Sequence, residues 1–178
     1  MHCVQETKIE SLRSLIAELE RGVEIIRDLE VAVFRAKENG NGSIGAHFRH
    51  NLDFINAFLK GIGDGRIDYN DRPRDTLIET RPSYAVERMH FAMRRLERLK
   101  PEMLDRIVMV RSEIDEDAWH VSSIARELEF LHSHTVHHYA VVARLMPASE
   151  RVALSTLGVA PSTLRYQAAG IGNAFVTQ

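Results

Sequence analysis

Hydrophobic residues recur along this chain at the three- and four-residue steps of amphipathic helices, in four separate stretches. The first stretch begins at Ile9 and keeps this spacing up to a gap at Glu30, after which Val33 continues the stripe. The run Asn39-Gly40-Asn41-Gly42 follows, and it predicts a stop because both residue types accept the left-handed backbone that ends helices. The pattern therefore predicts one long helix from residue 9 to about residue 39.

The second stretch predicts a helix that starts after Ser43, a residue type that caps helix N-termini, and ends near Gly61. Five apolar residues share one broad side of this helix: Ile44, Phe48, Leu52, Ile55 and Leu59. His47, His50 and Phe54 form a neighbouring stripe, displaced by a quarter-turn or more at ~100° per residue. The second helix therefore presents both an apolar side and a side that carries histidines.

Residues 64–82 are predicted to form a loop, because Asp64-Gly65 opens the segment and prolines interrupt and close it. A third helix is expected from Ala85 to about Lys100, with apolar residues in heptad spacing. The short apolar run 107–110 is consistent with either a strand or a buried connector, and the pattern does not decide between them. The acidic residues 113–117 are expected to form a solvated turn.

The fourth helix is predicted from Val121 or Ser122 to about Met146. Its inward stripe is otherwise largely apolar but contains two histidines and a glutamate: Ile124, Glu127, Leu131, His134, His138, Val142 and Leu145. Residues 147–178 are expected to form an irregular C-terminal tail. Four amphipathic helices predict an all-α fold, a four-helix bundle with long irregular connections, in a single domain over residues 1–178 whose core spans about 8–146.

Composition and charge favour an ordinary globular protein and exclude several other classes. Hydrophobic residues make up 44% of the chain and charged residues 27%, which is typical of soluble domains. A net charge of -2 gives no basic footprint for nucleic acid, and no apolar run approaches the ~20 residues that span a bilayer. The N-terminus lacks a signal-peptide pattern, and the single cysteine, Cys3, permits no internal disulfide. We therefore expect a cytoplasmic protein without nucleic-acid or membrane partners.

Four of the nine histidines fall within the eight residues from His132 to Tyr139. His134 and His138 stand four residues apart, so on a helix their imidazoles lie on one face, one turn apart. This is how a helix offers two nitrogen ligands to one metal ion. A lone histidine on a helix seam is more often a core residue. A pair backed by a histidine on another helix favours a metal site, because an ion satisfies one nitrogen of each buried ring.

The second helix offers two candidates for the third ligand. His50 lies deeper in that helix and is favoured, while His47 is expected to support the site or line its pocket. Three imidazoles with an open position are typical of catalytic zinc, since structural sites are closed by four protein ligands. Asp53, one turn after His50, either gives a carboxylate to the ion, orients an imidazole or is an exposed helix residue. The metal site is thus predicted at His50, His134 and His138.

Two parts of the chain resemble the DinB-like (YfiT-like) superfamily: residues 43–53, and residues 126–130 with 133–140. The resemblance covers most of residues 8–146. It implies a four-helix bundle with a divalent ion near one end, commonly zinc or nickel, bound by one histidine of the second helix and an H-x-x-x-H pair of the last. On this chain those ligands are His50, His134 and His138.

The resemblance also implies a chemistry and partners. Characterised members include thiol S-transferases that use bacillithiol or mycothiol and a thiol-dependent maleylpyruvate isomerase, and dimers are frequent. The expected partners are therefore a low-molecular-weight thiol, a small-molecule electrophile and a second copy of the chain. Residues 69–75 match no cofactor-binding element, so the resemblance does not place the thiol.

Two functions follow from a three-histidine site. In the first, the protein is a metal-dependent thiol S-transferase or hydrolase, because a bound ion lowers the pKa of water to ~7 and deprotonates a bound thiol. In the second, it is a non-catalytic metal-binding or interaction protein of unknown role. A general acid or base near the ion would separate the two, and Glu127 and Asp53 are the candidates.

Two arginines of the predicted loop also bear on function. Arg72 and Arg74 either clamp an anionic substrate, since guanidinium suits carboxylates, or pair with nearby acidic side chains. The acidic neighbours are Asp71, Asp75 and Glu79. Pairing with these neighbours is the favoured interpretation.

Overall fold

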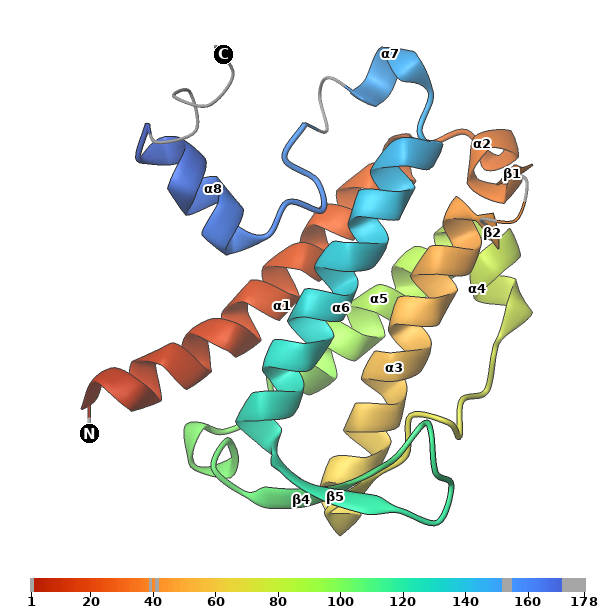
Figure 1. Ribbon diagram of the computed structural model, residues 1–178. Helices are drawn as coiled ribbons and strands as arrows, with labels where there is room; N and C mark the ends of the chain where they lie inside the picture. Colours follow the sequence, from red (N-terminus) through yellow and green to blue (C-terminus); the bar gives the residue numbers. More distant parts are fainter. Residues whose placement is uncertain (1, 39, 41, 152–154, 171–178) are drawn as a thin grey trace.

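Four long helices pack side by side in the computed structural model, which describes residues 2–38, 40, 42–151 and 155–170 (Figure 1). They are α1 (His2–Asp28), α3 (Ile44–Asp64), α5 (Pro82–Leu96) and α6 (Ile124–Leu145). Helices α3 and α6 lie next to each other and run in opposite directions (Figure 1). The four helices predicted from hydrophobic spacing are therefore present, and α3 and α6 carry the histidines.

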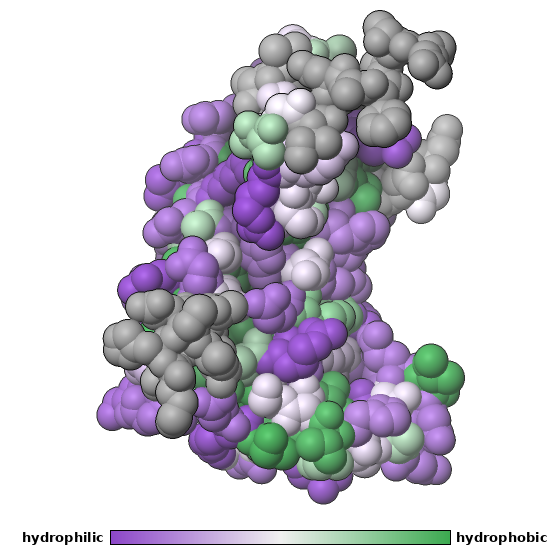
Figure 2. Space-filling view, turned by 60° about the vertical axis from the view of Figure 1, so that its left-hand side comes forward, coloured by the Kyte–Doolittle hydropathy of each residue, from purple (hydrophilic) through white to green (hydrophobic). Residues whose placement is uncertain are grey.

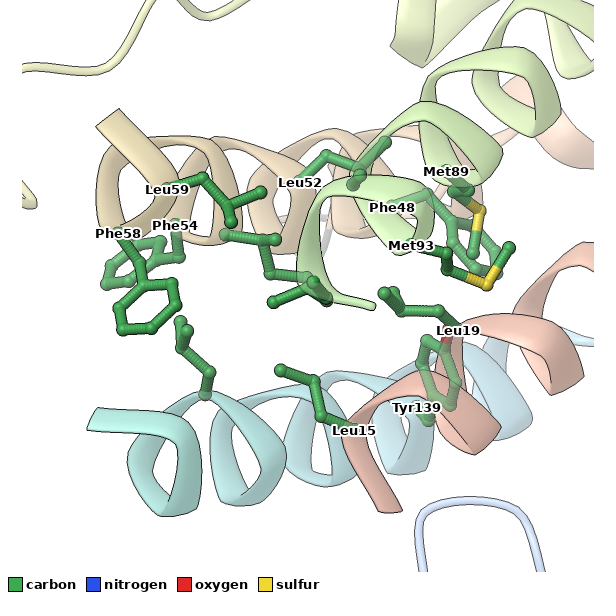
Figure 3. Packing of buried hydrophobic residues seen from close by; sticks show 14 of the residues in the cluster. Leu15, Leu19, Phe48, Leu52, Phe54, Phe58, Leu59, Met89, Met93 and Tyr139 are labelled. Carbon is green, nitrogen blue, oxygen red and sulfur yellow. The ribbon is translucent and has the colours of Figure 1, made fainter. Parts of the chain in front are cut away.

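The core lies between these helices and is built from the apolar stripes that the sequence predicts. Side chains from all four helices point toward one another in Figure 3, among them Leu19, Leu52, Met89 and Tyr139. Each is almost fully buried, and burying such a side chain contributes roughly 1.5–3 kcal/mol. The packed core fixes the position of α3 relative to α6.

The prediction of a purely all-α bundle is wrong, because a three-stranded sheet lies at one end of the helices (Figure 1). Its strands are β3 (Arg66–Ile67), β4 (Ile107–Arg111) and β5 (Trp119–Ser123), in the order β3-β4-β5. β3 runs parallel to β4, and β4 pairs antiparallel with β5, with Met109 opposite Val121. The apolar run at 107–110, for which strand and connector were both open, is a strand.

The last helix begins later than predicted, because the residues before it form a strand of the sheet. The hydroxyl of Ser123 accepts a hydrogen bond from the backbone N–H of Arg126 at 3.2 Å, so the N-cap is Ser123. Val121 and Ser122 consequently belong to β5, where a β-branched residue is well suited to pairing. The acidic turn is confirmed: its residues are exposed, and the Ser112 hydroxyl accepts from the N–H groups of Ile114 and Asp115.

The predicted first helix is shorter than its hydrophobic pattern. It ends at Asp28, and a separate short helix, α2 (Val31–Arg35), takes up the remaining apolar residues. Strands β1 (Lys37–Glu38) and β2 (Gly42–Ser43) then pair antiparallel. The predicted stop at residues 39–42 includes two asparagines that lie outside the described residues; its two glycines both have positive φ, which allows the sharp turn.

The predicted loop over residues 64–82 contains a short helix, α4 (Thr76–Thr80), in addition to β3. The carboxylate of Asp75 caps α4 by accepting the N–H of Leu77. α4 packs closely on α3, since a Cβ at Gly45 would overlap the backbone oxygen of Glu79. Helix α5 begins directly afterwards at Pro82. Proline suits this first helical position because a backbone N–H there would have no acceptor within the helix.

Short helices also occur beyond α5 and α6. They are η1 (Pro101–Met103), α7 (Ala148–Arg151) and α8 (Pro161–Ala168). The tail packs on the bundle in part, because Leu157 is buried and Arg21 of α1 donates to the Thr156 hydroxyl at 2.6 Å. Residues 152–154 and 171–178 of the predicted tail lie outside the described residues.

The exposed surface is mostly hydrophilic on the face shown in Figure 2, and hydrophobic side chains gather at the lower end, where the sheet lies in Figure 1. Exposed apolar residues of this end include Ile107, Ile114 and Val121. No helix in the described ranges combines the length and apolar character that a bilayer crossing requires.

Candidate metal centre

The packing of α3 against α6 brings His50, His134 and His138 together, although His50 is 84 residues away from His134 in the chain. One possible ligand nitrogen from each ring lies within 4.8 Å of the others. All three side chains are half-buried. The three residues predicted as ligands therefore lie close enough to bind one metal ion.

The shortest contact in this group has the geometry expected of two ligands on one ion. Nε2 of His50 lies 3.2 Å from Nε2 of His134. Two nitrogens on a tetrahedral ion with bonds of about 2.0 Å are about 3.3 Å apart. The ring centroids of His50 and His134 lie 4.6 and 4.5 Å from that of His138. A cation could enter this group with small side-chain adjustments.

His47 contacts the group from one turn earlier on α3. Its Nδ1 lies 2.9 Å from Nδ1 of His138, a hydrogen bond in which one ring donates and the other accepts. When Nδ1 of a histidine donates such a bond, its Nε2 keeps a lone pair that faces the ion. His47 thus takes the supporting place predicted for it.

His134 has an unused polar atom. Its Nδ1 is buried and has no hydrogen-bond partner among the described residues. A buried polar nitrogen without a partner costs about 1–3 kcal/mol. Because Nε2 of the same ring contacts His50, Nδ1 points away from the three-histidine group and would need a partner of its own.

Three aromatic side chains form a wall beside the histidines, which we call the aromatic wall: Phe54, Tyr69 and Phe130. The ring of Phe54 stacks on His134 at 4.3 Å between centroids and lies 4.9 Å from His50. Tyr69 and Phe130 also line a neighbouring cavity of about 410 Å³. The wall gives the metal centre one apolar side.

Burial keeps the three imidazoles neutral. It lowers the pKa of His50 to about 4, helped by the nearby charges of Arg72 and Arg49. Burial also lowers the pKa of His134 to about 4 and that of His138 to about 3, and the neighbouring imidazoles contribute to both shifts. Because metal ions bind the neutral form of histidine, the cluster is ready to bind a cation at neutral pH.

Asp53 is neither a ligand in the three-histidine group nor an exposed residue. It is only 2% exposed, and its Oδ2 lies 3.4 Å from Nη1 of Arg49, whose Nε lies 3.2 Å from Glu79. Burial raises the pKa of Asp53, and the charges of Arg49 and Arg72 partly offset this shift. The carboxylate is held by an arginine rather than by an imidazole.

Glu127 faces inward as predicted, but both of its oxygens are engaged. Tyr69 donates its hydroxyl to Oε2 at 2.8 Å, and Ser122 donates to Oε1 at 2.6 Å. The residue is 6% exposed and precedes His134 by seven positions, or about 10 Å along a helix. These bonds make Glu127 a structural residue rather than a base for the metal centre.

The carboxylates predicted to pair with Arg72 and Arg74 contact other groups. Asp71 pairs with Lys60 at 2.6 Å, and Glu79 pairs with Arg49. Asp75 accepts from the Tyr84 hydroxyl at 3.0 Å. The guanidinium of Arg72 instead lies over the ring of Phe54, at 4.5 Å from its centre. This arrangement disagrees with the favoured interpretation of Arg72.

Comparisons of the chain with protein-family models, with curated proteins and with solved structures found no match. The DinB-like resemblance therefore stays a prediction, and the function is proposed from the geometry of the site.

The remaining histidines of the described part of the chain contribute less. His132 lies on another side of α6, in a groove with Ser11 and Arg165. The ring of His137 meets that of His138 edge-on at 5.3 Å, and His120 is exposed on β5. None of these three belongs to the three-histidine group.

The aromatic wall is the part of the site that sequence reasoning largely missed. Phe54 follows His50 by four residues, and Phe130 precedes His134 by four. Because the two helices run in opposite directions, both aromatic rings lie on the same side of the histidines. This spacing was a readable signal, whereas Tyr69 comes from a connection with no periodic pattern.

Proposed function

We propose that this protein is a divalent-metal-dependent enzyme, with zinc or nickel held by His50, His134 and His138. The observation that carries the proposal is the convergence of three neutral imidazoles from two helices. Among the described residues this group offers three protein ligands, so one or more coordination positions would remain for a reactant. The reaction we favour is the transfer of a low-molecular-weight thiol to a small-molecule electrophile.

Thiol transfer is favoured over hydrolysis by the positions of the carboxylates. Hydrolysis at a metal commonly uses a nearby carboxylate to take a proton from water. Glu127 is held by two hydroxyl groups, and Asp53 is paired with Arg49. A thiol bound to a divalent ion loses its proton without a protein base. The site therefore suits a reaction that starts from a thiolate.

The aromatic wall supports a role for an organic electrophile. Phe54 stacks on His134, and Phe130 lies within 5.8 Å of the same ring. An apolar surface beside the open coordination positions excludes water and favours the carbon skeleton of a small molecule. His47 orients His138 by their hydrogen bond.

The test is turnover by the metal-loaded protein. Protein loaded with zinc or nickel is incubated with monobromobimane and, in parallel, cysteine, glutathione or bacillithiol, and conjugate formation is followed by fluorescence. We expect metal-dependent turnover that His138→Ala abolishes. His132→Ala, a histidine on another side of α6, should retain it. Full metal binding without turnover for any thiol would overturn the enzymatic proposal and favour a non-catalytic metal-binding protein.

A further inference from the structure

Arg72 is a positive charge beside the metal centre that the proposed thiol chemistry does not use. It lies in the connection between β3 and α4, and its guanidinium carbon is 4.5 Å from the centre of the Phe54 ring. The same ring stacks on His134 at 4.3 Å. These two contacts place the guanidinium within about 9 Å of the His134 ring, a span that one small molecule can bridge.

Arg72 forms no ion pair in the described part of the chain, although its charge acts on the buried carboxylate of Asp53. Its Nε is buried and has no hydrogen-bond partner there. The three acidic residues nearest in sequence, Asp68, Asp71 and Asp75, bind other side chains instead. The positive charge of Arg72 also contributes to the low pKa of His50 and of His134. A guanidinium that belongs to no ion pair of the described residues therefore lies near the three imidazoles.

The connection holds Arg72 in place from both sides. The backbone N–H of Arg72 donates to the carbonyl of Asn70 at 3.1 Å, and the preceding Asp71 is paired with Lys60 of α3. Arg74 adopts a left-handed backbone with φ of 49°, a conformation that costs energy for a residue with a side chain. The chain thus accepts some strain where it positions Arg72 over Phe54.

We propose that Arg72 binds the carboxylate of a small substrate whose thiol end lies at the three-histidine centre. Stacking on Phe54 covers one face of the guanidinium, and its edge remains able to donate two parallel hydrogen bonds to a carboxylate. The proposal depends on the proposed metal function, and it specifies the substrate class as a carboxylate-bearing thiol.

The experiment compares two thiols on the Co²⁺-loaded protein, where thiolate binding produces a charge-transfer absorption band. 3-Mercaptopropionate carries a carboxylate, and 2-mercaptoethanol of similar size does not. We expect 3-mercaptopropionate to bind with a Kd at least ~10-fold lower, since a charge-assisted bidentate contact is worth that much or more. Arg72→Gln should remove this preference, and Arg72→Lys should restore it only in part.

Arg74→Gln is the matched control, because it removes the same charge from the same connection while leaving the Phe54 contact intact. This variant should keep the preference, and circular dichroism of each variant should show an unchanged unfolding midpoint. Equal affinities for both thiols in the Co²⁺-loaded wild type, or a preference that survives in Arg72→Gln, would overturn the role of Arg72 alone. Failure of the wild type to bind Co²⁺ would overturn the metal centre as well, and the cobalt spectrum distinguishes the two results.

Discussion

Helix α6 carries two clusters of buried polar side chains, and they differ in how their polar atoms are satisfied. At Glu127, each carboxylate oxygen accepts a hydroxyl hydrogen bond, from Tyr69 and from Ser122. At His134 and His138, imidazoles contact other imidazoles, and one buried ring nitrogen has no partner. Each oxygen of the first cluster has a donor, whereas in the second the Nε2 atoms of His50 and His134 face each other at 3.2 Å, a separation that a shared cation would span. Within two turns of one helix, Glu127 is therefore a structural polar group, whereas His134 belongs to a candidate binding site.

The aromatic wall joins the two clusters while keeping them chemically distinct. Tyr69 donates to Glu127 and also stacks on Phe54, which in turn stacks on His134. Removing either cluster should therefore produce a different result: loss of metal binding for the histidines and loss of stability for the glutamate.

The largest effect is expected from His134→Ala. Removal of one ligand leaves two imidazoles, too few to hold the ion in competition with water, so the metal content should fall from roughly one ion per chain to background. Elemental analysis after dialysis measures this change. His132→Ala is the matched control on the same helix and should keep its metal. Retention of one ion per chain in the His134 variant would refute the assignment of His134.

The second effect concerns Glu127→Ala, which leaves the hydroxyls of Tyr69 and Ser122 without their acceptor. We expect the free energy of unfolding of the metal-free protein to fall by about 2–3 kcal/mol, because buried donors lose their partner. Urea denaturation measures this change. Glu87→Ala, at an exposed position of α5, should change stability by no more than about 0.5 kcal/mol. Normal stability with lost metal binding would reverse the roles given to the two clusters.

A smaller effect is expected from His47→Ala. This substitution removes the hydrogen-bond partner of His138 but no ligand. Such supporting residues typically change metal affinity 10- to 100-fold. Competition with a chromophoric chelator should show this weaker binding, and the protein should still reach one ion per chain at high metal concentration. Complete loss of metal would instead make His47 a ligand.

The smallest effect is the share of a single imidazole, that of His134, in the pH dependence of stability of the metal-free protein. The pKa values of His50, His134 and His138 are lowered to about 4, 4 and 3, whereas the unfolded value is about 6.5. Between these values the unfolded chain binds more protons, so stability is fully present above pH 6.5 and falls as the pH drops toward 4. The half-exposed imidazoles are screened by solvent, which limits the loss to about 1 kcal/mol per ring. His134→Gln should reduce the slope measured by urea denaturation at several pH values, and an unchanged slope would contradict the burial argument.

Much of the bundle and the ligand set could be predicted because both depend on helical spacing. The four apolar stripes define four helices, and the four-residue step between His134 and His138 places both rings on one face. His50 then joins these two histidines as long as α3 and α6 are neighbours. The supporting place of His47 followed from its position one turn before His50.

The sheet and the connections could not be read in the same way. β5 begins with Trp119 and contains one clear β-branched residue, so its pattern is too short to compete with the helix that follows. The roles of Tyr69 and Arg72 depend on where a connection without periodicity crosses α3. The partners of Asp71, Asp75 and Glu79 were also set by tertiary contacts with α3 and α5 rather than by nearness in sequence.

X-ray absorption spectroscopy on protein loaded with zinc or nickel, combined with elemental analysis of the same sample, tests the three-histidine centre itself. We expect about one ion per chain, with three imidazole nitrogens at about 2.0–2.1 Å and at least one further light ligand from solvent. Addition of a thiol should replace that light ligand with sulfur at about 2.3 Å. The absence of bound metal, or a first shell without imidazole, would refute the metal centre at His50, His134 and His138.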